Sequence, residues 1–444
     1  MSHYKPYPVY KDSGVEWLGQ VPGHWAVSPL KYVVTFRSGG TPSKDKQEFW
    51  DGDIPWASAK DLKKEQLEDT QDHLTELAVT SGAASLVPAG SVLVVVRGMI
   101  LARIFPVAEA MVPMAINQDL KALHASSKLD GRFLAHLLRG LADESLCRLE
   151  EAGHGTKALR MEAWTSMQLT IPPSEEQCAI LSHLDRETVR IDALVEKKAR
   201  FIELLREKRQ ALITHAVTKG LDPNVKMKDS GVEWLGEVPE HWAVCKLSFR
   251  YSVELGKMLD EKKLTKTSLV PYLRNQDVQW GAINIQNLPE MDIHPAEIER
   301  YTVMDGDLMV CEGGDVGRAA IWRGESSVFG YQKALHRLRP RLQNTDTAEF
   351  FFFSLLTAKK RGVFEESDSK ATIAHLPAEK FRQYRFAFPP KREQREIADH
   401  VRIESDSLDV LLTKTARSIA LLKERRSALI TAAVTGQIDL REAT

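Results

Sequence analysis

The chain contains 444 residues, of which 43% are hydrophobic and 27% are charged, and its formal net charge is −1. This composition is typical of a globular protein of roughly two to four domains, and it excludes a chain that binds nucleic acid through bulk charge, so any basic surface has to be local. The four cysteines are scattered singly, which excludes a CxxC zinc motif and a disulfide framework and indicates a reducing compartment.

The beginning of the chain and its longest apolar stretch show no secretory or membrane segment. Residues 1–14, MSHYKPYPVYKDSG, are polar and lack the apolar run of a signal peptide. Residues 86–96, LVPAGSVLVVV, are broken by Pro88 and Gly90 and are shorter than the ~20 residues that span a bilayer. Their valine-rich half, residues 92–96, predicts a buried strand. We therefore expect a cytoplasmic protein without a membrane segment.

Two long stretches of the sequence occur twice. Residues 11–27, KDSGVEWLGQVPGHWAV, recur 217 positions later at residues 228–244 as KDSGVEWLGEVPEHWAV. The same offset relates residues 171–222 to residues 388–439. One constant offset for both pairs indicates a tandem duplication.

Each copy contains a short arm, a variable block and a long terminal segment. We expect the following order: an arm at 1–27 that repeats 218–244, a first variable block at 28–170, a terminal segment at 171–222, the second arm and variable block at 223–387, and a second terminal segment at 388–444.

The two terminal segments are predicted to be long helices. Each begins with Pro-Pro, where a helix can start but not continue, and neither contains another Gly or Pro before Gly220 or Gly436. Apolar residues recur every seven positions, which places them in one long seam along each helix. About forty residues form a helix roughly 60 Å long. We expect the two helices to pair as an antiparallel coiled coil. The alternative is two independent amphipathic helices, each on its own domain.

The two variable blocks mix strand-like and helical stretches. Valine-rich residues 92–96 and residues 307–311 predict strands, and residues 133–141, FLAHLLRGL, predict a short helix. The blocks show little similarity to each other, and each is long enough for its own core. We therefore predict an α+β (α/β-like) protein with two globular domains.

The position of the two arms suggests a circularly permuted arrangement. The second arm directly follows the first long helix, whereas the second helix is followed by TGQIDLREAT, residues 435–444. We expect the N-terminal arm to occupy the corresponding place beside the end of the second helix. The alternative is that each arm caps the domain that follows it. Trp17, Leu18, Val21 and Trp25 are interpreted as packing residues of the arm.

No catalytic constellation is present in the sequence. An amino-methyltransferase would need Asn-Pro-Pro-aromatic, but the two Pro-Pro pairs stand in IPPS and FPPK. Neither a GxGxxG loop nor a Walker A sequence occurs, and histidines such as His136 and His336 are isolated. We therefore predict no catalytic and no metal-binding residue, and no cofactor on this chain.

With these features the sequence resembles the specificity subunit of Type I restriction–modification systems. The resemblance covers nearly the whole chain and depends on the tandem architecture and on the following stretches: PPxxEQ (Pro172, Pro173, Glu176, Gln177 and Pro389, Pro390, Glu393, Gln394), SALITAAVTGQID (427–439), SGGTPS (38–43) followed by IPW (54–56), INQD (116–119) and EGGDVGR (312–318). Two departures are the KDSGVEWLG arms, which only part of the family has, and the lack of a TPS counterpart in the second block.

The resemblance implies a fold and a function. The two variable blocks would be target recognition domains, each reading one half of a split, asymmetric double-stranded DNA sequence. The paired helices would separate these domains and bind two methyltransferase (modification) subunits, through which restriction/translocase subunits would join. Adenine methylation and DNA cleavage would then belong to the partner subunits, with S-adenosylmethionine, ATP and Mg there. The rival hypothesis is a structural or regulatory adaptor that keeps the scaffold without reading DNA.

Candidate DNA-binding residues have side chains or amides that suit DNA and lie near predicted turns or strand ends. Arg and Lys suit guanine, Asn and Gln suit adenine, and Lys, Arg, Ser, Thr and glycine amides suit phosphates. In the first block the candidates are Gly39, Gly40, Thr41, Ser43, Lys44, Lys60, Arg97, Asn117, Gln118, Lys157 and Arg160. In the second block they are Lys257, Arg274, Asn275, Gln276, Arg318, Tyr331, Gln332, Lys333 and Lys370. The alternative for most of them is a solvated surface.

Four polar residues of the terminal helices are repeated by the duplication. They are Gln177, Arg209, Gln394 and Arg426. We predict that they contribute to the interface with the methyltransferase subunits. Helix capping or ion pairs within the chain are the alternative.

Overall fold

The computed structural model describes residues 4–152, 155–259, 267–324, 328–342, 344–365 and 375–441. The chain divides into two compact units. Unit 1 comprises Met1–Ala199 and Ala416–Thr444, and unit 2 comprises Arg200–Thr415. Each unit therefore contains one arm, one variable block and a part of each long helix. None of the helices in the described ranges is long and apolar enough to cross a membrane.

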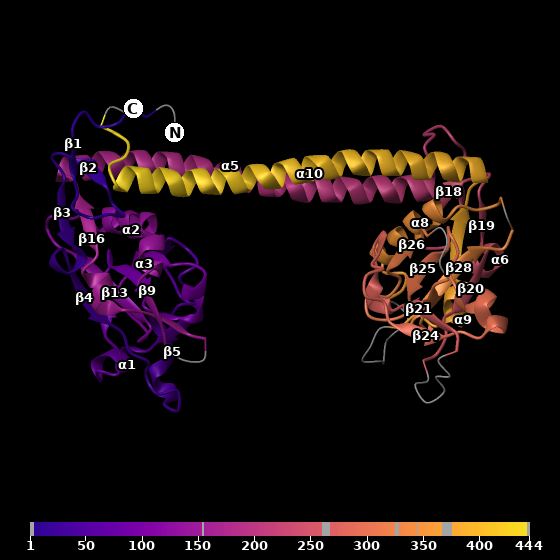
Figure 1. The fold of residues 1–444 in the computed structure, drawn as a ribbon, viewed down its shortest axis with the longest axis horizontal. Helices are drawn as coiled ribbons and strands as arrows, with labels where there is room; N and C mark the ends of the chain where they lie inside the picture. Colours follow the sequence, from indigo (N-terminus) through magenta and orange to yellow (C-terminus); the bar gives the residue numbers. More distant parts are fainter. Residues whose placement is uncertain are drawn as a thin grey trace. The chain divides into compact units, whose positions relative to one another are not determined.

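The variable block of unit 1 is built on a five-stranded and a four-stranded sheet (Figure 1). The five-stranded sheet has the order β4 (Val34–Ser38), β13 (Leu120–Ala125), β9 (Val92–Val95), β11 (Val107–Ala110) and β6 (Gln66–Leu67). The four-stranded sheet has the order β7 (Asp72–Leu74), β5 (Trp50–Ala57), β12 (Met114–Ile116) and β8 (Leu86–Val87). Strand β9 is wholly buried, and α2 (Gly131–Gly140) packs against it. The strand predicted near 92–96 and the helix predicted near 133–141 are confirmed.

The variable block of unit 2 is built on a four-stranded and a three-stranded sheet. The first has the order β20 (Tyr251–Leu255), β28 (Leu335–Pro340), β25 (Leu308–Cys311) and β26 (Ala319–Ile321). The second has the order β24 (Glu290–Asp292), β21 (Leu269–Leu273) and β27 (Gly330–Tyr331). Helix α8 (Ala348–Lys360) covers β26, and the strand predicted near 307–311 is confirmed as β25.

The two variable blocks share one framework although their sequences differ. Strands β4, β13 and β9 are adjacent in unit 1 in the same antiparallel order as β20, β28 and β25 in unit 2. Strand β5 runs parallel to β12 with Ala57 opposite Ile116, and β21 runs parallel to β27 with Leu273 opposite Tyr331. Both blocks therefore bring the ends of one parallel strand pair together at equivalent places.

A glycine at the end of β4 and of β20 allows a close approach of two backbone segments. A Cβ on Gly39 would lie 1.9 Å from the carbonyl oxygen of Ile116, and a Cβ on Gly256 would lie 2.2 Å from that of Tyr331. The next residue in each case, Gly40 or Lys257, donates its backbone N–H to the same carbonyl over 2.9 Å. Only glycine fits both places, so these two positions are equivalent in structure as well as in sequence.

The terminal segments form two long helices, α5 (Ser174–Lys219) and α10 (Lys391–Val434). In unit 1 the first half of α5 lies beside the last part of α10, shown in yellow (Figure 1). In unit 2 the last part of α5 lies beside the first half of α10 and shares an apolar cluster with it. The helices are therefore antiparallel in each unit, as the sequence predicted, and the alternative of two independent helices is wrong.

The N-terminal arm packs at the end of α10, as the duplication predicted. The arm strands β1 (Tyr10–Asp12) and β2 (Gln20–Pro22) pair in the same register as β17 (Met227–Asp229) and β18 (Glu237–Pro239). The Tyr10 hydroxyl donates to the backbone oxygen of Gly436 over 3.1 Å. The carbonyl of Lys5 accepts from the N–H of Asp439 over 2.8 Å. The circularly permuted arrangement is confirmed.

Each arm is fastened to the first turn of a long helix through a glutamate. His24 lies 2.7 Å from Glu176 of α5, and His241 lies 2.8 Å from Glu393 of α10. The tryptophan after each histidine is fully buried, as predicted for Trp25. The duplicated arm and the duplicated PPxxEQ stretch therefore recur together because each contacts the other.

The two buried tryptophans differ in their hydrogen bonds. The indole N–H of Trp242 donates to Glu393 over 3.0 Å, whereas the indole nitrogen of Trp25 has no partner. The Tyr7 hydroxyl instead donates to Glu176 over 2.5 Å.

We therefore expect Trp242→Phe to lower the free energy of unfolding by about 1 kcal/mol more than Trp25→Phe, because only the first change removes a hydrogen bond to a charged group. Hydrogen exchange of the amides in each unit would measure both losses. Equal losses would show that the bond to Glu393 adds nothing to stability.

Candidate nucleic-acid interface

The candidate DNA-binding residues gather where the parallel strands end. In unit 1, β5 and β12 are followed by two loops, residues 58–61 and 117–119. In unit 2, β21 and β27 are followed by residues 274–277 and 332–334. Because the carboxyl ends of parallel strands meet at one edge of a sheet, each pair of loops lies side by side.

An aspartate shapes the first loop in both units. The Asp61 carboxylate accepts the backbone N–H of Ser58 over 2.9 Å and its hydroxyl over 2.8 Å. The Asp277 carboxylate accepts the backbone N–H of Arg274 over 2.8 Å and holds the guanidinium of the same residue through two further bonds of 2.8 Å. The loops SAKD and RNQD are thus one turn with different side chains.

The second loop is also the same in both units. The backbone N–H of Asn117 donates to Ala57, and that of Gln332 donates to Leu273, both over 2.9 Å. The Asn117 side chain is nearly buried and accepts the N–H of Asp119 over 3.1 Å. Asn117 is therefore equivalent to Gln332, and the next residue, the exposed Gln118, is equivalent to Lys333, which is also exposed.

The glycine loop of unit 1 lies against the second loop. The Thr41 hydroxyl donates to the side-chain oxygen of Gln118, and the carbonyl of Gly40 accepts the indole N–H of Trp56 over 3.0 Å. The carbonyl of Ser43 accepts the indole N–H of Trp50 over 3.1 Å. The neighbouring Lys44 is exposed. The structure thus brings Gly39, Gly40 and Thr41 next to the second loop.

Two of the predicted cations of unit 1, Lys60 and Arg97, lie at these loops. Lys60 is exposed in the first loop and lies 2.6 Å from Asp72. Arg97 is 62% exposed and lies 3.6 Å from Asp119 of the second loop. Lys157 is on the strand β15 (Lys157–Leu159) and lies opposite Gly98, the residue after Arg97 on β10 (Arg97–Gly98). Arg160 follows that strand and donates to the backbone of Cys147 over 3.4 Å.

Most candidates of unit 2 also lie together. The Asn275 side chain donates to Gly313 over 3.1 Å, and its backbone oxygen accepts from Arg318 over 2.9 Å. Lys257 follows the close-packed Gly256 and lies 2.5 Å from Glu297. Gln276 is exposed in the same turn. Lys370 lies outside the described residues.

Tyr331 is corrected from a DNA-binding candidate to a core residue. Its side chain is 0% exposed, and its hydroxyl donates to the backbone oxygen of Arg300 over 3.1 Å. Because the ring fills the core at the end of β27, it is inaccessible to a ligand. The sequence prediction had relied on the turn-like glycine before it.

The two repeated glutamines have the same internal contacts. Gln177 is 1% exposed and its side-chain oxygen accepts the N–H of Asp130 over 2.8 Å. Gln394 is 0% exposed and accepts the N–H of Thr347 over 2.9 Å. Asp130 and Thr347 are the N-caps of α2 and α8. The capping alternative accounts for both glutamines, and their role in a partner interface stays a prediction.

The two repeated arginines form equivalent ion pairs between the long helices. Arg209 lies 2.9 Å from Asp409 in unit 2, and Arg426 lies 3.0 Å from Asp192 in unit 1. The duplication relates Asp192 to Asp409 as it relates Arg209 to Arg426. The ion-pair alternative thus accounts for both arginines, and a contact with a partner subunit stays a prediction for their exposed parts.

In unit 1 this ion pair also reaches the variable block. Arg426 lies 2.6 Å from Glu65, and Arg139 of α2 lies 3.4 Å from the same carboxylate. Burial favours the neutral form of Glu65, but the hydrogen bond from Arg426 and the charges of both arginines lower the pKa of this carboxyl below its ordinary value. The carboxylate is therefore charged at neutral pH and links the domain to α10.

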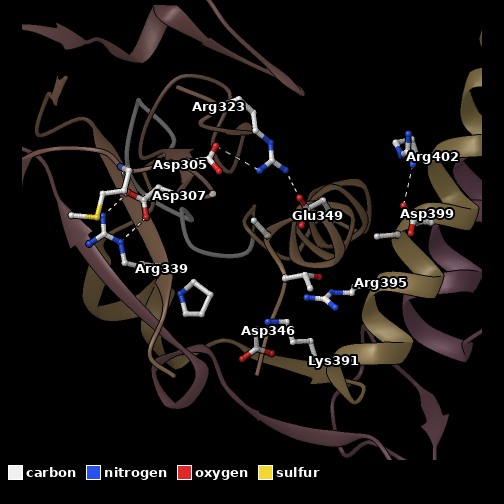
Figure 2. A pocket seen from close by; sticks show the side chains of 16 residues that line it. Asp305, Asp307, Arg323, Arg339, Asp346, Glu349, Lys391, Arg395, Asp399 and Arg402 are labelled. Atoms are coloured by element: carbon white, nitrogen blue, oxygen red, sulfur yellow. Dashed lines mark hydrogen bonds and ion pairs between the residues drawn. The ribbon is translucent and has the colours of Figure 1, made fainter. Parts of the chain in front are cut away.

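A pocket of about 850 Å³ in unit 2 is lined by acidic and basic side chains (Figure 2). Arg339 lies 2.7 Å from Asp307, Arg323 contacts Glu349, and other cations lie near the first turns of α10. Arg402 pairs with Asp399 in the same lining, so three of its arginines are engaged in ion pairs within the chain. Within the described ranges, no three His, Cys, Asp or Glu side chains form a group that could hold a metal.

Sequence reasoning missed three residues that shape the interface, namely Asp61, Asp277 and Gly256. The signal for the two aspartates was the pair of stretches PWASAKDL (55–62) and PYLRNQDV (271–278), which align at an offset of 216 instead of 217. The signal for Gly256 was its place at the constant offset of 217 from Gly39.

The fold and the interface define a class of protein: a duplicated scaffold with two domains of one framework, each presenting different polar side chains at equivalent loops. The family model described as Type I restriction modification DNA specificity domain matches residues 22–203 and 239–405. The chain belongs to this family.

Curated relatives agree with this assignment. The chain is 32% identical over 198 residues to the Type I restriction enzyme EcoR124I/EcoR124II specificity subunit of Escherichia coli, covering 44% of this chain and 46% of the relative. It is 20% identical over 435 residues to the MjaVIII specificity subunit of Methanocaldococcus jannaschii, covering 95% of each. The chain spans about half the length of the first of these relatives.

Two solved structures have the same fold. A chain from work on complex assembly and conformational transition of the type I R-M system aligns with a TM-score of 0.71 at 15% identity, covering 94% of this chain and 99% of that one. The HsdS subunit from Thermoanaerobacter tengcongensis aligns with a TM-score of 0.56 at 14% identity, covering 94% and 98%. At these identities the structures support the fold alone.

Proposed function

We propose that this chain reads an asymmetric, bipartite double-stranded DNA target and directs adenine methylation and DNA cleavage by partner subunits. The observation that carries the proposal is the shared framework of the two variable blocks. Both place two loops at the end of one parallel strand pair, yet the side chains there differ. Equal frameworks with different polar groups suit two different half-sites.

The duplicated parts of the chain support a partner that is present twice. The long helices and arms present similar surfaces in both units, so a partner that fits one copy fits the other. We assign these two surfaces to two methyltransferase subunits, through which restriction/translocase subunits would join. S-adenosylmethionine, ATP and Mg would belong to those partners.

Mapping of adenine methylation tests the proposal. The full chain would be co-expressed with a methyltransferase subunit of its own system, and methylated positions would be read by sequencing the host genome. We expect a split motif with two different halves and a constant spacer. An assembled complex that methylates no defined motif would favour the adaptor hypothesis instead.

Arg274→Ala provides a more local prediction. Asp277 holds the Arg274 guanidinium, but a third of this side chain is exposed at the loop. If Arg274 contacts a base, its removal should weaken recognition by about 1–3 kcal/mol and relax one position of one half-site. The measurement is the methylation motif of the variant, and an unchanged motif would remove Arg274 from the base-reading residues.

A further inference from the structure

Two exposed positions in the paired loops carry the same two residue types in exchanged places. In unit 1, the first loop carries Lys60 and the second carries Gln118. In unit 2, the equivalent positions carry Gln276 and Lys333. The aspartates that shape the first loop establish the equivalence of Lys60 with Gln276.

Backbone bonds establish the equivalence in the second loop. Asn117 precedes Gln118 and Gln332 precedes Lys333, and the N–H groups of Asn117 and Gln332 bond to the ends of β5 and β21. The residues that follow Gln118 and Lys333 are also equivalent. The carbonyl of Asp119 accepts the N–H of Val96, as the carbonyl of Ala334 accepts the N–H of Glu312. Both loops therefore match residue by residue, and the exchange of Lys and Gln is not an effect of alignment.

A neighbouring side chain holds the Gln118 amide in a defined direction. Thr41 donates its hydroxyl to the side-chain oxygen of Gln118. This bond leaves the NH₂ group and one lone pair of the oxygen available, which is the pre-organisation that a recognition group needs. In unit 2 the Gln276 amide lies beside the Arg274 guanidinium, from which its oxygen would accept bonds of 3.1 and 3.2 Å if the amide were rotated. The Lys60–Asp72 pair is solvent-exposed and can be replaced by a ligand at little cost.

We propose that these two positions are the specificity-determining pair of each domain. Lysine suits the two acceptors of guanine, whereas glutamine pairs with the acceptor and donor of adenine. Exchanging them between the loops would give the two domains opposite preferences at the two base positions. This inference rests on the proposed function, because it concerns the side chains that read the half-sites.

The test uses two double variants of the full chain in complex with its methyltransferase. Lys60→Gln with Gln118→Lys gives the loops of unit 1 the two residue types of unit 2. Gln276→Lys with Lys333→Gln gives the loops of unit 2 those of unit 1. Both leave the net charge unchanged, so the attraction to phosphates is retained. Selection from DNA duplexes with randomised half-sites would measure the base preference directly, even in a complex that methylates poorly.

We expect each double variant to change the preferred bases in one half of the motif only, with about tenfold or greater loss of preference for the original bases. Lys128→Gln is the matched control for the single variant Lys60→Gln. Lys128 is exposed and lies after the last residue of β13, whereas Gln118 lies before its first residue. Loss of the Lys128 charge should therefore leave the motif unchanged.

Two outcomes would overturn the inference. One is an unchanged base ranking in both double variants. The other is a Lys60→Gln variant that weakens binding to all sequences equally and is fully restored by Gln118→Lys, since that result indicates a phosphate contact. A wild-type complex without a split motif would instead contradict the proposed function, so the two failures are distinguishable.

Discussion

Replacement of Gln394 by alanine should lower the stability of unit 2 by about 3–5 kcal/mol. The side chain is wholly buried at the start of α10. It accepts the N–H of Thr347 and donates to the carbonyls of Pro389 and Thr345 over 2.9 and 3.3 Å. Alanine leaves these groups buried without a partner, each at a cost of about 1–3 kcal/mol. Denaturant unfolding monitored by hydrogen exchange within unit 2 would measure the loss.

Gln177→Ala should produce the same effect in unit 1, because Gln177 bonds Asp130, Lys128 and Pro172 in the same way. The exposed Gln71 and Gln383 serve as alanine controls in the two units. If either buried variant kept its stability but lost association with the methyltransferase, the glutamines would belong to the partner interface as first predicted, and the capping role would be wrong.

Acidification from pH 7.5 to pH 5 should destabilise each unit by about 2 kcal/mol through one buried histidine. Burial, together with the charge of Arg139, lowers the pKa of His136 to about 4. Burial also lowers the pKa of His336 to about 4, against the opposing effect of its hydrogen bond to Leu376. The unfolded chain takes up these protons near pH 6.5, whereas the folded chain does so only near pH 4.

The sign of this effect follows from the proton count. Between pH 6.5 and 4 the unfolded state binds more protons, so stability falls as the pH falls through this window and is fully present above it. In the His136→Phe variant, the free energy of unfolding of unit 1 should fall by about 2 kcal/mol less between pH 7.5 and pH 5 than in the wild type. His124 is exposed, so His124→Phe is the control. A pH dependence unchanged by His136→Phe would show that other groups cause it.

Much of the scaffold could be predicted from repetition and periodicity. The Pro-Pro starts, the seven-residue seam and the constant offset identified α5 and α10 within a few residues of their ends. The arm that repeats KDSGVEWLG was correctly placed at the end of α10. These features are local or periodic, so a single sequence contains them in full.

The candidate interface was predicted less well, because proximity there depends on strand pairing. Lys60 and Gln118 are 58 positions apart in the sequence, and only the parallel pairing of β5 with β12 makes them neighbours. Tyr331 was misread for the same reason, since a tyrosine after a glycine looks exposed until the strand is placed in the core. For Gln177 and Arg209, equal contacts within the chain also account for the repetition, so repetition alone does not distinguish them from partner-binding residues.

The sequence by itself therefore determined the duplication, the helices, the arms and the family, because each is expressed as spacing along the chain. Only the tertiary structure decided that two dissimilar blocks share one framework and that Lys and Gln change places within it. Strand pairing depends on backbone hydrogen bonds and on a core that many apolar residues can fill. The two domains can therefore keep the same loops while their sequences differ.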